Sequence, residues 1–161
     1  MKVISFSLWG DNPKYTVGAI KNAELAKIIY PGWVCRYYVG DSVPADCIQK
    51  LSSFDYCEIV KMNVPGNWEG MYWRFFPASD ENVDVMISRD ADSRLNLKEK
   101  AAVDAWLNSE CSFHIMRDHP WHTTPILGGM WGTKKGCIKN ISELIKTYPV
   151  VGNFYQTDST F

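Results

Sequence analysis

The chain has 161 residues, which is enough for one domain with its own core and too few for two full-sized domains. Hydrophobic residues make up 46% of it and charged residues 22%, a composition that excludes a disordered or fibrous protein. Its 17 basic and 18 acidic residues nearly cancel, so the overall charge indicates neither nucleic acid nor an anionic membrane as a partner. The aromatic content of 14% fits a sugar-binding groove, although aromatic residues more commonly fill a core.

Neither a signal peptide nor a membrane span is predicted. Residues 1–9 form a short strand-like run without a long apolar region, and no window approaches the roughly 20 apolar residues of a membrane span. The cysteines are odd in number and have no Cys-x-x-Cys spacing: Cys35, Cys47, Cys57, Cys111 and Cys137. This pattern is typical of reduced, buried thiols in an intracellular protein, so we expect a cytoplasmic location.

Strands and helices are expected to alternate along the chain. The expected strands are residues 3–8, 33–39, 57–62, 83–88 and 112–116, and the expected helices are residues 13–30, 44–51, 72–76, 96–107 and 138–148. Asn12 and Asn96 are the expected caps of the first and fourth helices. The alternation predicts an α/β fold with a mostly parallel central sheet flanked by helices, in a single domain over residues 1–161. Residues 156–161 look like the start of another helix, so we expect the protein to continue.

Asp90 and Asp92 follow the fourth expected strand. In an extended segment a spacing of two points both carboxylates to the same side, where they can share one divalent cation. Ligands of open α/β sheets bind beyond the carboxyl ends of strands, and a cation there would neutralise a diphosphate leaving group. Arg74, Arg89 and Arg94 would add phosphate contacts through their forked donors. The alternative is a polar turn whose aspartates accept backbone hydrogen bonds.

The segment Ser88-Arg89-Asp90-Ala91-Asp92-Ser93, preceded by Tyr72-Trp73-Arg74-Phe75-Phe76-Pro77, resembles the Asp-x-Asp region of GT-A glycosyltransferases. The resemblance implies a GT-A-like sheet, with a Rossmann-like nucleotide-binding half and an acceptor half. It also implies a nucleoside-diphosphate-sugar donor, with a UDP-sugar favoured, and Mn²⁺ or Mg²⁺ held by Asp90 and Asp92. Residues 124–132 resemble the segment lining the sugar and acceptor pocket, and residues 155–161 resemble the family's later acidic segment. The arrangement is similar to small sugar transferases of bacteria and large DNA viruses.

Donor contacts are implied in two places by the same resemblance. The expected donor-binding residues are Ser7, Leu8, Trp9 and Tyr15 for the base and ribose, and Arg74, Arg89, Asp90, Ala91 and Asp92 for the diphosphate. For Trp9 and Tyr15 an equally good interpretation is that they pack the first loop onto the first helix.

Residues 118–131 are expected to shape the acceptor pocket. The expected acceptor contacts are His119, His122, Gly128, Gly129 and Trp131. Asp118 and Asp158 are the candidate catalytic bases. Three alternatives stay open. Asp118 and the two histidines would hold zinc, although their spacing matches no recognised ligand pattern. The glycine pair would form a tight turn or bulge, and Asp158 would cap a helix. The chain ends before the late histidine that completes the metal site in some GT-A enzymes.

Together these features predict a metal-dependent glycosyltransferase. It would move a hexose or deoxyhexose from a nucleoside-diphosphate sugar to a hydroxyl of a glycan or glycoprotein acceptor. One alternative is another metal-dependent nucleotide-phosphate enzyme, such as a nucleotidyltransferase, although residues 7–11 hold a single glycine where those enzymes have a glycine-rich loop. The other is a non-catalytic carbohydrate-binding domain, a class that is usually all-β.

Overall fold

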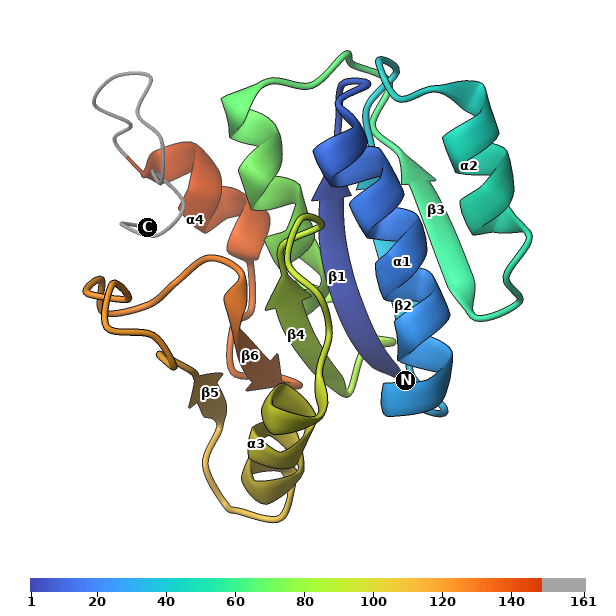
Figure 1. Cartoon of the computed structure of the whole chain (residues 1–161). Helices are drawn as coiled ribbons and strands as arrows, with labels where there is room; N and C mark the ends of the chain where they lie inside the picture. The colour runs from blue at the N-terminus through green and yellow to red at the C-terminus, as the bar shows by residue number, and fades with distance from the viewer. Residues whose placement is uncertain (149–161) are drawn as a thin grey trace.

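The fold combines six strands with helices on both sides of the sheet, in a computed structural model that describes residues 1–148 (Figure 1). In chain order the elements are β1 (Lys2–Leu8), α1 (Pro13–Ile29), β2 (Val34–Val39), α2 (Ala45–Ser52), β3 (Cys57–Lys61), the 3₁₀ helix η1 (Trp68–Ser79), β4 (Val85–Arg89), α3 (Leu97–Leu107), β5 (Phe113–Ile115), β6 (Met130–Lys134) and α4 (Ile141–Thr147). This arrangement confirms the predicted α/β fold with a mostly parallel sheet flanked by helices.

The strands lie in the order β3-β2-β1-β4-β6-β5. β3, β2, β1 and β4 are parallel, whereas β6 is antiparallel to both β4 and β5. The parallel strands therefore end at one edge of the sheet, which we call the carboxyl edge, and β6 begins there because Met130 pairs with Arg89. The strand order reverses between β1 and β4, which is the kind of place where open α/β sheets bind ligands.

The two faces of the sheet are covered by different helices. α1, α2 and α3 cover one face, and Figure 1 shows α1 beside β1 and in front of β2, with α2 next to β3. Because side chains alternate along a strand, Phe6 points to this face and packs with small α1 residues such as Ala23. η1 and α4 cover the opposite face, where Phe75, Met86 and Trp131 pack together. Burial of both faces is what stabilises the parallel part of the sheet.

Two predicted helix caps are confirmed. The Asn12 side chain accepts a hydrogen bond of 2.9 Å from the Lys14 backbone N–H at the start of α1. Asn96 likewise accepts one of 3.0 Å from the Glu99 backbone N–H at the start of α3. Each cap satisfies a backbone donor that has no partner within its helix.

Two elements differ from the sequence-based expectation. β6 was not expected, because its sequence Met-Trp-Gly-Thr-Lys lacks a run of β-branched residues and contains a glycine. That glycine, Gly132, lies so close to β4 that a Cβ atom would be 2.6 Å from the Met86 carbonyl oxygen. The helix expected at residues 72–76 is a longer 3₁₀ segment with Pro77 inside it. Packing on neighbouring strands, not local propensity, decides both elements.

The cysteines agree only partly with the expectation of burial. Cys35 and Cys47 are buried and Cys57 is half-buried, whereas Cys111 and Cys137 are exposed. None of the helices in residues 1–148 has the length and apolar composition needed to cross a membrane.

Candidate functional site

Asp90 lies at the carboxyl edge, directly after β4, and its carboxylate forms an ion pair with the Arg74 guanidinium from η1. Arg74 is only 7% exposed. Its backbone N–H donates a hydrogen bond of 3.0 Å to Ser7 Oγ on β1, and its Nη1 lies 3.4 Å from the carbonyl oxygen of Arg89. Three segments that are distant in sequence are therefore linked here, because Ser7 holds the backbone of Arg74 and Arg74 pairs with Asp90.

The segment that precedes β6 presses against the same carboxylate. A Cβ atom on Gly129 would lie 2.0 Å from Asp90 Oδ2, so only glycine leaves the carboxylate where it is. Ser88 Oγ fixes this segment by donating a hydrogen bond of 2.6 Å to the Gly128 carbonyl oxygen. The structure thus brings the predicted acceptor residues Gly128 and Gly129 against the predicted donor residue Asp90.

Asp92 forms an ion pair with a residue that the sequence analysis did not select. Its Oδ2 atom lies 2.7 Å from Lys14 Nζ, at the start of α1. The Asp92 side chain is 24% exposed and the Lys14 side chain 61%. The two residues are too far apart in sequence for any local motif to link them.

Asn22, also missed from the sequence, fixes the loop that carries both aspartates. Its fully buried amide donates a hydrogen bond of 2.7 Å to Ser93 O and longer ones to the carbonyl oxygens of Asp90 and Ala91. Its Oδ1 accepts a hydrogen bond of 3.1 Å from the Leu95 backbone N–H. The available signal was a polar residue placed beside alanines on the buried stripe of α1, because a buried amide needs partners from another segment.

Gly18 allows α1 to approach this loop. A Cβ atom at that position would lie 2.2 Å from the Ala91 carbonyl oxygen. Gly18 therefore acts together with Asn22 in setting the distance between α1 and the loop that carries Asp90 and Asp92.

The chemistry of these carboxylates suits a hard divalent cation. Carboxylate oxygens are the ligands that Mg²⁺ and Mn²⁺ prefer, and each of the two already faces a protein cation, Arg74 at Asp90 and Lys14 at Asp92. Within residues 1–148 no three His, Cys, Asp or Glu side chains gather into a metal-ligand group. By ligand type, the two carboxylates suit such a cation, and its other ligands would be substrate oxygens and water.

Arg89, expected to contact the diphosphate, belongs to a buried network of side chains. It is 2% exposed, and its Nε lies 3.4 Å from Glu99 Oε2 on α3. Burial raises the pKa of Glu99 and raises that of Tyr30, beside Arg89, to about 12. Burial also lowers the pKa of His114 to about 4, and the Arg89 charge acts in the same direction. We therefore assign Arg89 to supporting the end of β4, because phosphate contact would require it to leave this network.

Two further predicted donor residues, Leu8 and Ala91, have their side chains in the core beneath α1. The Leu8 carbonyl oxygen accepts a hydrogen bond of 2.9 Å from the Gly40 backbone N–H. Their contribution to the carboxyl edge is therefore through backbone position.

Trp9 and Tyr15 lie on either side of the β1–α1 connection. The Trp9 ring packs edge-on against Trp73 at 6.1 Å, and the adjacent loop follows it so closely that a Cβ atom on Gly66 would lie 2.4 Å from Trp9 Cβ. Trp9 therefore packs against η1 and the loop before it, whereas the alternative kept in the sequence analysis placed it against the first helix. Tyr15 is 38% exposed, and its ring lies 5.3 Å from Lys14 Nζ, which places it beside the Asp92 ion pair.

Asp118, His119 and His122 lie together in the loop between β5 and β6. Asp118 Oδ1 is 3.3 Å from His122 Nδ1, and Asp118 Oδ2 is 3.4 Å from Lys98 Nζ on α3. His119 Nδ1 accepts a hydrogen bond of 3.2 Å from the Trp121 backbone N–H, which holds the loop in a turn. This cluster faces Lys98, at the start of the helix that follows the Asp90–Asp92 loop.

Two predicted site residues remain, Trp131 and Asp158. Trp131 is 8% exposed and packs edge-on against Phe75 at 5.3 Å, so its ring belongs to the core under η1 and α4. We therefore remove it from the acceptor contacts. Asp158 lies outside the described residues.

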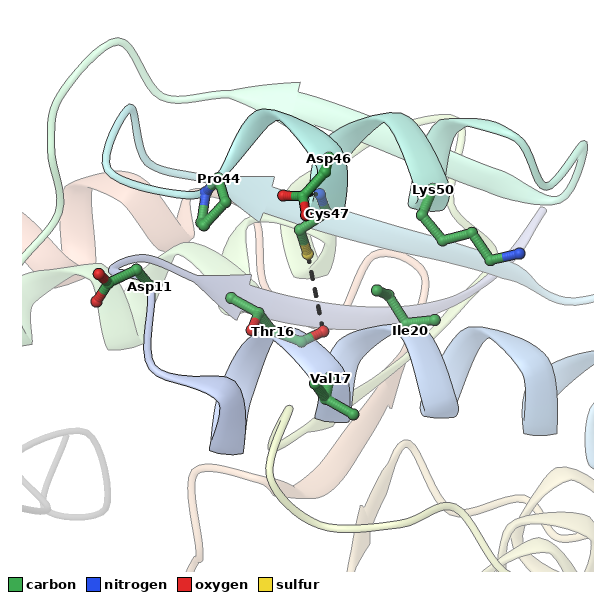
Figure 2. Close-up of a pocket in the computed structure, with 8 residues that line it drawn as sticks. All are labelled: Asp11, Thr16, Val17, Ile20, Pro44, Asp46, Cys47 and Lys50. Carbon is green, nitrogen blue, oxygen red and sulfur yellow. Dashed lines mark hydrogen bonds between the residues drawn. The ribbon is translucent and has the colours of Figure 1, made fainter.

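A hollow of about 360 Å³ opens between α1 and α2 (Figure 2). It is lined by Asp11, Thr16, Val17, Ile20, Pro44, Asp46, Cys47 and Lys50. At its base the Cys47 thiol donates a long hydrogen bond of 3.7 Å to the Thr16 carbonyl oxygen. None of the predicted site residues lines it, so the hollow is separate from the Asp90–Asp92 region.

No protein-family model matches the chain, and no curated protein matches it either. The function is therefore inferred from the chemistry of the carboxyl edge.

Proposed function

We propose that this chain is a metal-dependent glycosyltransferase domain of the GT-A type. It transfers a hexose or deoxyhexose from a nucleoside-diphosphate sugar, with a UDP-sugar favoured, to a hydroxyl of a glycan or glycoprotein. The observation that carries the proposal is the position of Asp90 and Asp92 directly after β4, at the carboxyl edge where the strand order reverses. This is where ligands of open α/β sheets bind.

In the proposed reaction the acceptor oxygen attacks C1 of the sugar, the bond from C1 to the diphosphate oxygen breaks, and the nucleoside diphosphate leaves with its negative charge. Mn²⁺ or Mg²⁺, when bound, supplies electrostatic stabilisation of that charge. Asp90 and Asp92 hold the cation, and Arg74 orients Asp90 from below. The Gly128–Gly129 segment brings the acceptor side of the site against the donor side.

The acceptor hydroxyl must lose a proton during transfer. Asp118 is the candidate base within the described residues, and Lys98 Nζ and His122 Nδ1 lie 3.4 Å and 3.3 Å from its carboxylate oxygens. Asp158 remains the second candidate for this role.

The α/β sheet disfavours the alternative of a non-catalytic carbohydrate-binding domain, because such domains are usually all-β. A nucleotidyltransferase would have a glycine-rich loop after β1. This chain instead has Trp9 there, packed against Trp73. Nucleotidyl transfer is best separated from glycosyl transfer by its products. A nucleotidyltransferase releases pyrophosphate from UTP in the presence of a sugar phosphate, whereas the proposed enzyme releases UDP from a UDP-sugar.

The first test is calorimetric titration of UDP and GDP into the protein, each with and without Mn²⁺. We expect UDP to bind only in the presence of the metal. Asp92→Asn keeps the shape of the side chain but removes the charge, so it should weaken metal-dependent UDP binding by about tenfold or more, roughly 1.4 kcal/mol. Asp55→Asn is the matched control, since Asp55 is exposed in the turn before β3 at the opposite edge of the sheet.

A folded protein that binds neither diphosphate would refute the proposal. Equal UDP binding by wild type and Asp92→Asn would remove the carboxylate from the site. Pyrophosphate release from UTP would replace glycosyl transfer by nucleotidyl transfer.

A further inference from the structure

The Lys14–Asp92 ion pair joins α1 to the aspartate loop at the place where the proposed metal and diphosphate meet. Lys14 follows Pro13 at the start of α1, where its backbone N–H donates a hydrogen bond to the side chain of the Asn12 cap. Its Nζ lies 2.7 Å from Asp92 Oδ2 and 5.3 Å from the centre of the Tyr15 ring. The side-chain ammonium is thus at the exposed mouth of the site, while Asp92 is three-quarters buried behind it.

The backbone positions of both partners are fixed by other contacts. Asn22 ties the carbonyl oxygens of Asp90, Ala91 and Ser93 to α1, and the missing side chain of Gly18 allows that approach. The proximity of Lys14 to Asp92 therefore follows from the packing of α1 and does not depend on the ion pair itself.

The pair contributes little to folding. A lysine ammonium that is 61% exposed gains only about 0–1 kcal/mol from such a contact. Arg74 differs in this respect, because its guanidinium is buried under Asp90 and is not free to move. A lysine carries a compact charge on a flexible stem with three donors, so Lys14 can change partners at low cost.

We propose that Lys14 exchanges partners during donor binding. It neutralises Asp92 before the metal binds, gives way when a divalent cation takes the Asp92 oxygens, and then moves its ammonium to a diphosphate oxygen of the incoming donor. Lys14 thereby competes with the metal in the unloaded protein and assists the nucleotide in the loaded one. This inference rests on the proposed function and adds to it a diphosphate-binding residue on α1.

The test compares Lys14→Met with wild type in two binding measurements. Mn²⁺ binding without nucleotide, measured by electron paramagnetic resonance of free Mn²⁺, should become about threefold to tenfold tighter, because a competing cation is gone. UDP binding at saturating Mn²⁺, measured by calorimetry, should become about tenfold weaker, because a charged contact to phosphate is lost. Uridine binding should stay unchanged, and Lys14→Arg should retain most of the UDP affinity.

Lys21→Met is the matched control. Lys21 lies on the same helix, is similarly exposed and forms a comparable ion pair of 2.8 Å, but with Glu24 on the helix surface. It should leave both affinities at their wild-type values.

Opposite changes in the two affinities would support the exchange, and no structural role for Lys14 produces them. If Lys14→Met weakens both Mn²⁺ and UDP binding, or changes neither, the exchange is overturned. The proposed function stays intact in that case, provided that the wild-type protein binds UDP with Mn²⁺. Wild-type protein that binds neither Mn²⁺ nor UDP would refute both proposals. Because this result needs only the wild-type protein, it is distinct from a failure of the Lys14 inference alone.

Discussion

Asp90 and Asp92 stand two residues apart, yet the molecule holds their carboxylates in different ways. Asp90 faces a buried guanidinium, whereas Asp92 faces an exposed ammonium. A substitution at Asp90 leaves the buried Arg74 charge without this carboxylate, so it disturbs the fold as well as the site. A substitution at Asp92 leaves behind an ammonium that is 61% exposed and that water can solvate. Asp92 is therefore the position at which binding and stability can be separated.

The buried histidine at position 114 links stability to pH. His114 is 7% exposed, stacks on Trp106 at 5.4 Å, and has a pKa lowered to about 4 from 6.5 by burial and by Arg89. Between these two pH values the unfolded chain binds a proton that the folded chain does not. The free energy of unfolding should therefore fall as the pH drops from 6.5 to about 4, by about 3 kcal/mol from this residue.

The measurement is urea unfolding of wild type and His114→Phe across that pH range. Phe keeps a ring against Trp106 and does not titrate, so its curve should be flatter. The raised pKa of Glu99 acts in the opposite direction, since stability is then lost as the pH rises, but both proteins contain it. Identical slopes in the two proteins would show that His114 does not make this contribution.

Among the elements, α1 has the largest part in shaping the site, because it carries Lys14, Gly18 and Asn22 along one side. Lys14 brings one cation to the aspartate loop, Gly18 allows close packing against it, and Asn22 fixes the backbone of that loop. The site therefore depends on a helix that contains none of the predicted carboxylates.

Asn22→Ala should destabilise the protein by about 2–4 kcal/mol, because it leaves buried backbone groups of the loop without their partners. We also expect weaker Mn²⁺ binding, since the loop positions both proposed ligands. Unfolding in urea and titration with Mn²⁺ measure the two effects. Lys27→Ala, at an exposed position of the same helix, should change stability by less than about 0.5 kcal/mol. An Asn22→Ala variant as stable as this control would show that Asn22 does not hold the aspartate loop in place.

At the scale of the whole molecule, one sheet separates two cores. The first lies under α1, α2 and α3 and includes Trp33 and Trp106, and the second lies under η1 and α4 and includes Trp131. β1 and β4 contribute side chains to both cores, so neither core can form without the central strands. The two cores of residues 1–148 therefore share the central strands.

Unfolding should therefore be a single cooperative transition. In guanidinium chloride, far-UV circular dichroism and tryptophan fluorescence should give the same midpoint, because the tryptophans report on both faces while circular dichroism reports on the backbone. Midpoints that separate would indicate two units that unfold independently.

The sequence by itself determined the α/β alternation, most strands and helices, the caps at Asn12 and Asn96, and the place of Asp90 and Asp92 after a buried strand. These features depend on residues that are close in sequence, because the spacing of hydrophobic residues and the chemistry of a helix cap are local properties. It missed β6, and it did not indicate that Arg89 and Trp131 are buried, because their residue types fit a site as well as a core.

Only the tertiary structure decided that β6 pairs with β4, that Arg74 meets Asp90, that Gly129 lies against the same carboxylate, and that α1 supplies Lys14 and Asn22. Each of these contacts joins residues separated by many positions in the chain. Their formation depends on strand order, register and helix packing, which bury surface from both partners at once, and no local pattern in either partner specifies the other.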